Sequence, residues 1–298
     1  MSGRENETET HEPVNGLDRL LAEIEEGQLS SIRKVVSEVI AVLASPGATV
    51  RELKMIIEID PPLAARILHL ANSAFYSRGR SYSTIEDAII LLGFEATLRL
   101  VLSQKVCELF TQGDAVESYS RARLWRHSTA TALLSRLIHR REFGVPGETA
   151  FACGLLHDLG LVIADQFRHQ HFVAALKESF AGQRPLRECE RERIGFDHGE
   201  VVLALAERWT LPREVIDCFK YLRDPFAGTG PHTRSVLSLF VANSYCRAHG
   251  FEHGGIASAR GPSLEDALSA IQILPAALDR LGIDLLEEIT QLEAKGLL

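Results

Sequence analysis

Cysteine is scarce and scattered in this sequence, which excludes a disulfide framework. Five cysteines occur among 298 residues, and no two of them form a C-x-x-C pair. Their odd number and their mostly apolar surroundings are typical of reduced, buried thiols. We therefore expect a reducing compartment, which predicts a cytoplasmic protein. The five are Cys107, Cys153, Cys189, Cys218 and Cys246.

Long apolar runs and a leader pattern are missing as well. No uninterrupted apolar run approaches the ~18 residues of a membrane-spanning helix, so we expect no membrane insertion. Residues 1–13 are polar and acidic and lack the apolar core of a signal peptide. Because this stretch also has no hydrophobic periodicity, it is predicted to be a disordered tail.

Positive charge is in deficit. The chain has 32 Lys and Arg against 40 Asp and Glu, a formal net charge of −8 at pH 7. This balance argues against broad nucleic-acid binding, which relies on neutralising phosphates. One arginine-rich stretch, residues 121–141, is interpreted as a solvated helix face. Its arginines are Arg121, Arg123, Arg126, Arg136, Arg140 and Arg141.

Strand-length alternation of apolar and polar residues is absent, so the sequence predicts an all-α fold, a multi-helix bundle. Several helix starts are marked by capping residues. Residues 49–52 form a possible capping box, Asp60 precedes Pro61 as an N-cap would, and residues 83–86 form a second possible capping box.

The helices are predicted to fall into two packed halves. Residues 14–118 form an N-terminal helical half, and residues 119–250 form a second one. The polar stretch 111–118 is a plausible joint between them. A glycine-rich loop and further helices are expected over residues 251–298.

The dipeptide His157-Asp158 is the most informative feature of the chain. It lies in an apolar segment, residues 150–164, that is typical of a helix buried on all sides. A carboxylate is rarely buried unless it is paired or binds a metal. Adjacent residues on a helix lie about 100° apart, so both side chains can reach one small volume. We expect this volume to hold a cation or a group that replaces one.

A second histidine occupies an apolar helical stripe. His127 alone could be a core histidine whose ring bonds to backbone carbonyls. Together with His157 and Asp158, it favours a shared polar site. The stripe, at spacings of i, i+3, i+7, i+10 and i+14, consists of Leu124, His127, Thr131, Leu134 and Ile138.

These motifs resemble a known family. The order LWRHS at residues 124–128 and GLLHDLG at residues 154–160 resembles the HD superfamily of metal-dependent phosphohydrolases. Residues 59–76, IDPPLAARILHLANSAFY, and residues 81–93, SYSTIEDAIILLG, resemble the narrower HDOD family, the HD-related output domain of bacterial signalling proteins. FDHGE at residues 196–200, followed by ERWTLP, continues the likeness, which makes the second half HD-like.

The sequence departs from active HD enzymes at two places. Where they typically have a distal Asp, this chain has Asn243. Where related binuclear phosphodiesterases have a "YHHDP" segment, residues 221–225 are YLRDP, so both histidines are absent. The loss of a carboxylate should weaken a divalent cation and its acidification of bound water.

The resemblance leaves a reduced set of candidate metal ligands. They could hold one divalent ion, Fe, Zn or Mn, weakly or not at all. His198 follows a Gly-Phe-Asp turn and could lie at a helix start instead of facing the site. The candidates are His127, His157, Asp158, Asn243 and His198.

The segment around residues 72–76 also has two interpretations. Asn72, Ser73 and Tyr76 could form a binding surface. Alternatively, the segment could simply end a helix, with Asn72 and Ser73 capping and Phe75 and Tyr76 packing. We favour the helix end for each residue taken separately.

Three functions remain open. We favour a non-catalytic regulatory module that acts through contacts with signalling proteins, as the resemblance implies, with no catalytic residue assigned. The alternative is a metal-dependent phosphohydrolase acting on a nucleotide or cyclic dinucleotide, in which Lys220 or Arg126 steadies a phosphate. The third is a nucleotide sensor without turnover.

Overall fold

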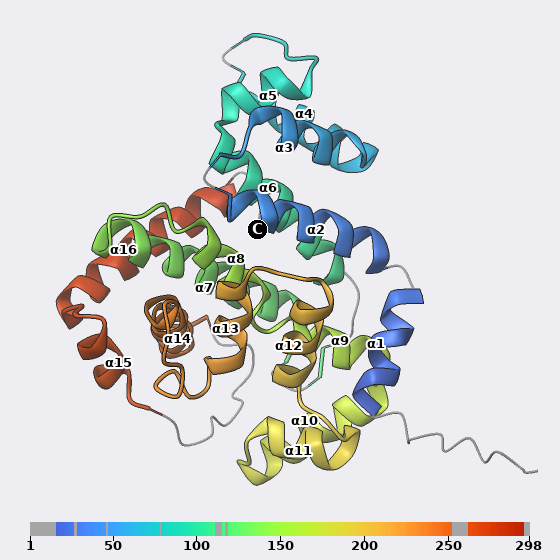
Figure 1. Cartoon of the computed structure of the whole chain (residues 1–298), viewed down its shortest axis with the longest axis vertical. Helices are drawn as coiled ribbons and strands as arrows, with labels where there is room; N and C mark the ends of the chain where they lie inside the picture. The colour runs from blue at the N-terminus through green and yellow to red at the C-terminus, as the bar shows by residue number, and fades with distance from the viewer. Residues whose placement is uncertain are drawn as a thin grey trace, which may run out of the picture.

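The computed structural model describes residues 16–26, 29–45, 47–77, 79–110, 115–116, 119–251 and 262–294. Within these ranges the protein is all-α and has no strand; the one β-type contact is an isolated bridge between Val116 and Tyr119 (Figure 1). The predicted fold class is therefore confirmed. The predicted tail at residues 1–13 and most of the predicted joint and glycine-rich loop lie outside the described residues.

The N-terminal half packs on the second half through several of its elements. Helix α1 contacts α12, and the turn η1 contacts α7. Helices α2 and α6 contact each other, and both contact α8 of the second half. Helices α3, α4 and α5 form a lobe beyond them, at the top of Figure 1. The helices of this half are α1 (Gly16–Glu26), α2 (Leu29–Leu43), α3 (Val50–Glu58), α4 (Pro61–Ala71), α5 (Ile85–Leu92) and α6 (Phe94–Cys107), followed by the 3-10 turn η1 (Glu108–Phe110).

The caps of α3 and α4 form as predicted. The Thr49 backbone N–H donates to Glu52 Oε2 over 2.7 Å, and the Thr49 hydroxyl accepts from the Glu52 N–H over 3.3 Å. Asp60 accepts from the Leu63 N–H over 3.0 Å, directly before Pro61. These local contacts satisfy backbone donors that have no partner inside the helix.

The cap of α5 lies one residue later than predicted. Thr84, not Ser83, accepts a hydrogen bond from the backbone of Asp87, over 3.1 Å. Ile85, Ala88 and Ile89 of this helix lie in the core.

The second half is arranged around α7, which is buried along most of its length and contacts α8, α14 and α16. Its helices are α7 (Arg121–Glu142), α8 (Glu148–Leu156), α9 (Leu159–Phe167), α10 (His169–Gly182), α11 (Leu186–Ile194), α12 (His198–Arg208), α13 (Arg213–Tyr221) and α14 (Thr233–Ala248). Helices α15 (Leu264–Ala270) and α16 (Pro275–Ala294) follow in the C-terminal segment.

The arginines of α7 are not all solvated, which corrects the prediction for two of them. Arg121 is buried and forms an ion pair of 2.6 Å with Asp165. Arg136 is buried as well and forms one of 2.6 Å with Glu288 of α16. A buried guanidinium needs such a partner because losing its hydration is costly.

The segment Glu148–Phe167 is apolar enough, by length and composition alone, to cross a membrane. The expectation that no apolar stretch approaches the length of a membrane-spanning helix is therefore qualified for this segment. In the structure 89% of its 18-residue window is buried inside the protein, a pattern that core helices of soluble proteins share. One such segment is weak grounds for a membrane span.

Candidate functional site

Three predicted ligands lie together in the protein interior. His127 comes from the N-terminal third of α7, His157 directly follows α8, and Asp158 directly precedes α9. One donor atom from each lies within 4.8 Å of the others. Nε2 of His157 is 3.1 Å from Asp158 Oδ2, and Nε2 of His127 is 3.7 Å from the same oxygen. All three side chains are buried, so this donor set is shielded from bulk water.

The helix is interrupted at His157 and Asp158, which corrects the prediction of one continuous helix. Helix α8 ends at Leu156 and α9 begins at Leu159. The start of α9 lies very close to the backbone at the start of α12. A Cβ atom on Gly160 would lie 1.9 Å from the backbone oxygen of His198, so only glycine fits there.

Backbone carbonyls orient both histidine rings. Nδ1 of His127 lies 2.8 Å from the carbonyl oxygen of Phe251, and Nδ1 of His157 lies 2.7 Å from that of Gly154. Because a carbonyl oxygen only accepts, each Nδ1 carries the proton and donates it. In the neutral rings, each Nε2 then presents a lone pair near Asp158. Such outer contacts are typical of histidines that bind metals.

Asn243 of α14 joins this group from a fourth helix. Its Oδ1 lies 3.1 Å from Nε2 of His127. Two lone pairs meet there when Nδ1 of His127 carries the proton. A cation between the atoms, or a half-turn of the amide that lets Nδ2 donate, would satisfy both. Four of the five predicted ligands are therefore brought together.

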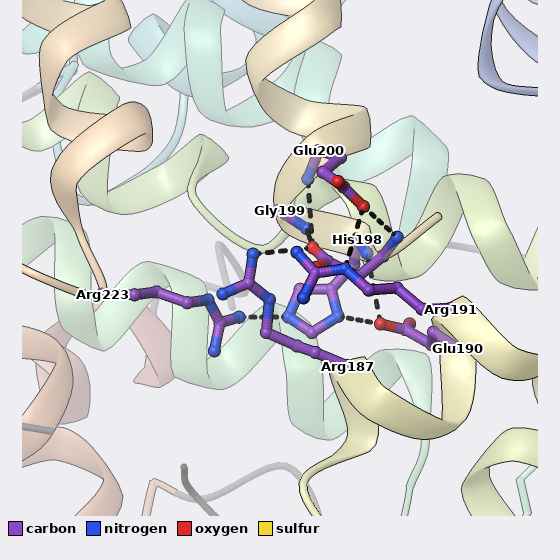
Figure 2. A network of polar contacts seen from close by, with 8 residues as sticks. Arg187, Glu190, Arg191, His198, Gly199, Glu200 and Arg223 are labelled. Atoms are coloured by element: carbon purple, nitrogen blue, oxygen red, sulfur yellow. Dashed lines mark hydrogen bonds and ion pairs between the residues drawn. The ribbon is translucent and has the colours of Figure 1, made fainter. Parts of the chain in front are cut away.

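His198 lies outside the group and belongs to a separate polar network (Figure 2). Its Nδ1 is 2.5 Å from Glu190 Oε2, and its Nε2 contacts Nη2 of Arg223. Both ring nitrogens are thus engaged by other side chains. The alternative that His198 begins a helix is confirmed, since it is the first residue of α12.

Asp197 joins this network to the start of α12. It caps the helix by accepting from the N–H of Gly199 over 2.8 Å. It also forms ion pairs of 2.9 Å with Arg187 and 2.6 Å with Arg191. Burial raises the pKa of Asp197, but Arg187, His198 and Arg191 together lower it below its usual value. The cap therefore stays ionised at neutral pH.

Arg223 links the network to the donor set. The residue is exposed overall, yet its guanidinium points at the ring of His198 (Figure 2). The loss of hydration lowers the pKa of Arg223 most, and Arg187 lowers it further, while Asp158 and Asp197 oppose them. A fixed positive charge therefore acts on the carboxylate of Asp158.

Two residues suggested as phosphate contacts are engaged elsewhere. The guanidinium of Arg126 lies 4.9 Å above the ring of Phe251 and pairs with Glu293 at 3.6 Å. The ammonium of Lys220 lies 5.0 Å from the centre of the Tyr221 ring. Nothing in their placement assigns a phosphate to either.

The helix-end interpretation is confirmed for Asn72, whereas Phe75, which was expected to pack, is 65% exposed. Asn72 is the C-cap of α4, and its amide donates to the carbonyl of Leu68 and to that of Tyr82, each over 2.8 Å. Its Oδ1 accepts from the Tyr82 N–H over 2.8 Å. The side chain thus fastens the loop before α5 to the end of α4.

Several residues that shape the site left no signal in the sequence. Phe251 and Gly154 contribute only backbone carbonyls, which any residue provides. Glu190 meets His198 across the turn between α11 and α12, a spacing that no known motif marks. These contacts depend on the tertiary structure.

Comparisons with known proteins agree with this architecture. The family model of the HDOD domain matches residues 29–225. A crystal structure of an HDOD domain protein with unknown function from Geobacter sulfurreducens has a TM-score of 0.70 and 26% identity, covering 88% of this chain and 90% of its own.

More distant structures share the fold. A protein from Shewanella amazonensis SB2B described as a candidate phosphohydrolase has a TM-score of 0.63 and 23% identity, covering 93% of this chain and 95% of its own. A protein from Marinobacter aquaeolei VT8 described as a candidate signal transduction protein has a TM-score of 0.68 and 20% identity. The match covers 95% of this chain and 67% of that protein.

One curated relative, an uncharacterized protein of Treponema pallidum, is 22% identical over 189 residues, or 62% of this chain. The chain spans 35% of that relative's length.

Proposed function

This chain belongs to the HDOD family, and we propose that it is a cytoplasmic regulatory module of signal transduction. In this proposal it acts through contacts with other proteins and does not hydrolyse a phosphoester. The observation that carries the proposal is the amide of Asn243, 3.1 Å from Nε2 of His127. HD phosphohydrolases, which the chain resembles, typically have a carboxylate there.

The charge around the donor set supports this proposal. A divalent ion held by His127, His157 and Asp158 would meet one negative charge, whereas an Asp at position 243 would add a second. With one carboxylate fewer, the ion is held more weakly and acidifies bound water less. The positive charge of Arg223, which acts on Asp158, works in the same direction.

The residues present still fit a metal ion. Nε2 of His157 has no hydrogen-bond partner within the described residues, although its ring is buried. Two imidazoles and one carboxylate suit Zn or Fe(II), and Mn as a harder alternative. His127, His157 and Asp158 would hold the ion, with Asn243 as a weak fourth ligand. When bound, such an ion would polarise a phosphoryl oxygen and lower the pKa of a bound water.

Turnover by wild type, Asn243→Asp and His157→Ala tests the proposal. Each purified protein is incubated with bis(p-nitrophenyl) phosphate or a cyclic dinucleotide in the presence of Mn²⁺, Fe²⁺ or Zn²⁺. We expect wild type to match His157→Ala in every combination. Metal-dependent hydrolysis by wild type that His157→Ala abolishes would refute it.

Hydrolysis is the second candidate, and one observation favours it. The donor atoms of His127, His157 and Asp158 already lie within 4.8 Å of one another, and three nitrogen and oxygen ligands leave open positions on an ion. If Asn243→Asp hydrolyses substrate and wild type does not, the amide of Asn243 is what prevents hydrolysis at an otherwise complete site. If neither protein does, the network around Arg223 also opposes catalysis.

A further inference from the structure

A cleft of about 360 Å³ lies where the N-terminal half, α7 and α16 meet. Its α7 wall is formed by Trp125, Thr129, Leu133, Arg136 and Arg140. At 100° per residue these positions fall within one 80° stripe of the helix. His127 lies about 160° from the centre of that stripe, so the cleft is on the face of α7 opposite the donor set.

The cleft carries an excess of positive charge. Arg99 of α6 and Arg136 and Arg140 of α7 line it, and Glu288 is the one carboxylate among the lining residues. Arg99 is paired with Glu148 at 2.7 Å. Arg140 is exposed and forms no ion pair with any described residue. An anion entering the cleft therefore meets at least one unneutralised guanidinium.

The buried end of the cleft has unused polar capacity. Arg136 is 5% exposed, and its Nη2 donates to both carboxylate oxygens of Glu288, over 2.9 and 2.6 Å. Its Nε has no hydrogen-bond partner within the described residues. The hydroxyl of Thr129, which is also buried, likewise has no hydrogen-bond partner within the described residues. Buried donors without partners are uncommon and indicate a missing acceptor.

Three aromatic side chains also line the cleft. They are Tyr76, from the segment that follows α4, and the buried Trp125 and Phe151. Flat rings of this kind favour a flat ring in a ligand, because stacking buries area at little entropic cost. The volume is within the range of small-molecule sites.

We propose that this cleft binds a small phosphate monoester that carries a flat ring system. The arginines would take the phosphate, for which the guanidinium fork is well shaped, and the aromatic side chains would take the ring. Such a ligand would contact α6, α7 and α16 at once and would compete with Glu288 for Arg136. Binding would therefore change how firmly α16 is held. The proposal does not depend on the function proposed for the donor set.

Calorimetric titration of the full chain with adenosine monophosphate tests this site. We expect saturable binding, weakened about ten-fold by Arg140→Gln, since one charge-assisted contact is lost. Arg141→Gln is the matched control, because Arg141 is the exposed neighbour that pairs with Asp284 instead. It should bind as wild type does. Circular dichroism checks that each variant is folded.

Three outcomes would overturn the proposal. The first is no saturable binding up to ~1 mM ligand, the weak end of the usual range. The second is equal weakening by Arg141→Gln, or binding lost in His157→Ala and kept in Arg140→Gln, which would place the ligand at the donor set. The third is equal affinity for inorganic phosphate or for adenosine, which would remove the role of the ring or of the phosphate. Binding unchanged in His157→Ala keeps this test separate from the function of the donor set.

Discussion

Asn243 Oδ1 and His127 Nε2 face each other at 3.1 Å, while the opposite nitrogen of His127 is committed to the carbonyl of Phe251. The amide thus meets a ring nitrogen that has already used its one proton elsewhere. This relationship between α7 and α14 defines what the donor set can hold. An Asp at position 243 would add a second negative charge to the site, which the neutral amide of Asn243 does not provide.

Asn243→Asp should bind a divalent ion more tightly than wild type. The change adds a negative charge and a hard oxygen beside His127 without altering the size of the side chain. We expect the dissociation constant for Mn²⁺, measured by calorimetry, to fall by about ten-fold or more. Asn243→Ala serves as the control and should bind no better than wild type. An unchanged affinity in Asn243→Asp would show that the fourth side chain does not contact the ion.

His139 should make the stability of the protein sensitive to acid. Burial lowers the pKa of His139 to about 4, with Arg234 acting in the same sense and Glu214 opposing. The pKa of His139 in the folded protein lies below the unfolded value of 6.5. The contribution of His139 to the free energy of unfolding is therefore complete above about pH 6.5 and is lost as the pH falls toward 4. The loss amounts to about 3 kcal/mol.

The comparison with His139→Gln isolates this effect. Urea unfolding at several pH values should show a smaller fall in stability for the variant between about pH 6.5 and pH 4, since Gln does not titrate there. Parallel curves for the two proteins would contradict the assignment. The other histidines are common to both proteins, so their contributions cancel.

Much of the site was accessible from the sequence because its signals are local. The apolar surroundings of His157 and Asp158, and the helical stripe that carries His127, predict a shared buried site, and the structure brings these residues together. The caps at Thr49 and Asp60 are local as well. In each case, neighbouring residues provide the partner or the pattern.

The remainder depends on contacts between distant segments. Near the break at His157, Gly160 packs on the backbone of His198, 38 positions away. The sequence predicts that Arg121 is solvated like its neighbouring arginines, but it is buried in an ion pair with Asp165. His198 has a suitable residue type for a ligand, yet Glu190 holds its ring elsewhere. Periodicity cannot show which distant partner a side chain will meet.

Arg121→Met should strongly destabilise the fold. The change leaves the buried carboxylate of Asp165 without the guanidinium that lies 2.6 Å away. Among the described residues, only His169 then remains as its partner, at 2.8 Å. We expect a loss of about 3 kcal/mol in the free energy of unfolding. Arg141→Met, at an exposed pair with Asp284, should cost less than about 1 kcal/mol. Equal effects in urea unfolding would argue against a buried pair at Arg121.

Gly160→Ala should disturb the packing of α9 against α12. The added Cβ would lie 1.9 Å from the backbone oxygen of His198, and backbone cannot move aside as a flexible side chain can. We expect destabilisation of about 3 kcal/mol. Gly47→Ala is the control, since nothing lies within 4 Å of its Cβ position. Thermal unfolding of both variants measures the difference, and similar melting temperatures would refute the close approach.

A single-turnover assay tests the central claim most directly. Metal-loaded wild type, in excess over a cyclic dinucleotide or bis(p-nitrophenyl) phosphate, would reveal even one round of hydrolysis per site. If the chain is a regulatory module whose weakened site does no chemistry, product should form no faster than with His157→Ala. Product that forms with wild type and disappears in His157→Ala would contradict this and would make the protein a phosphohydrolase.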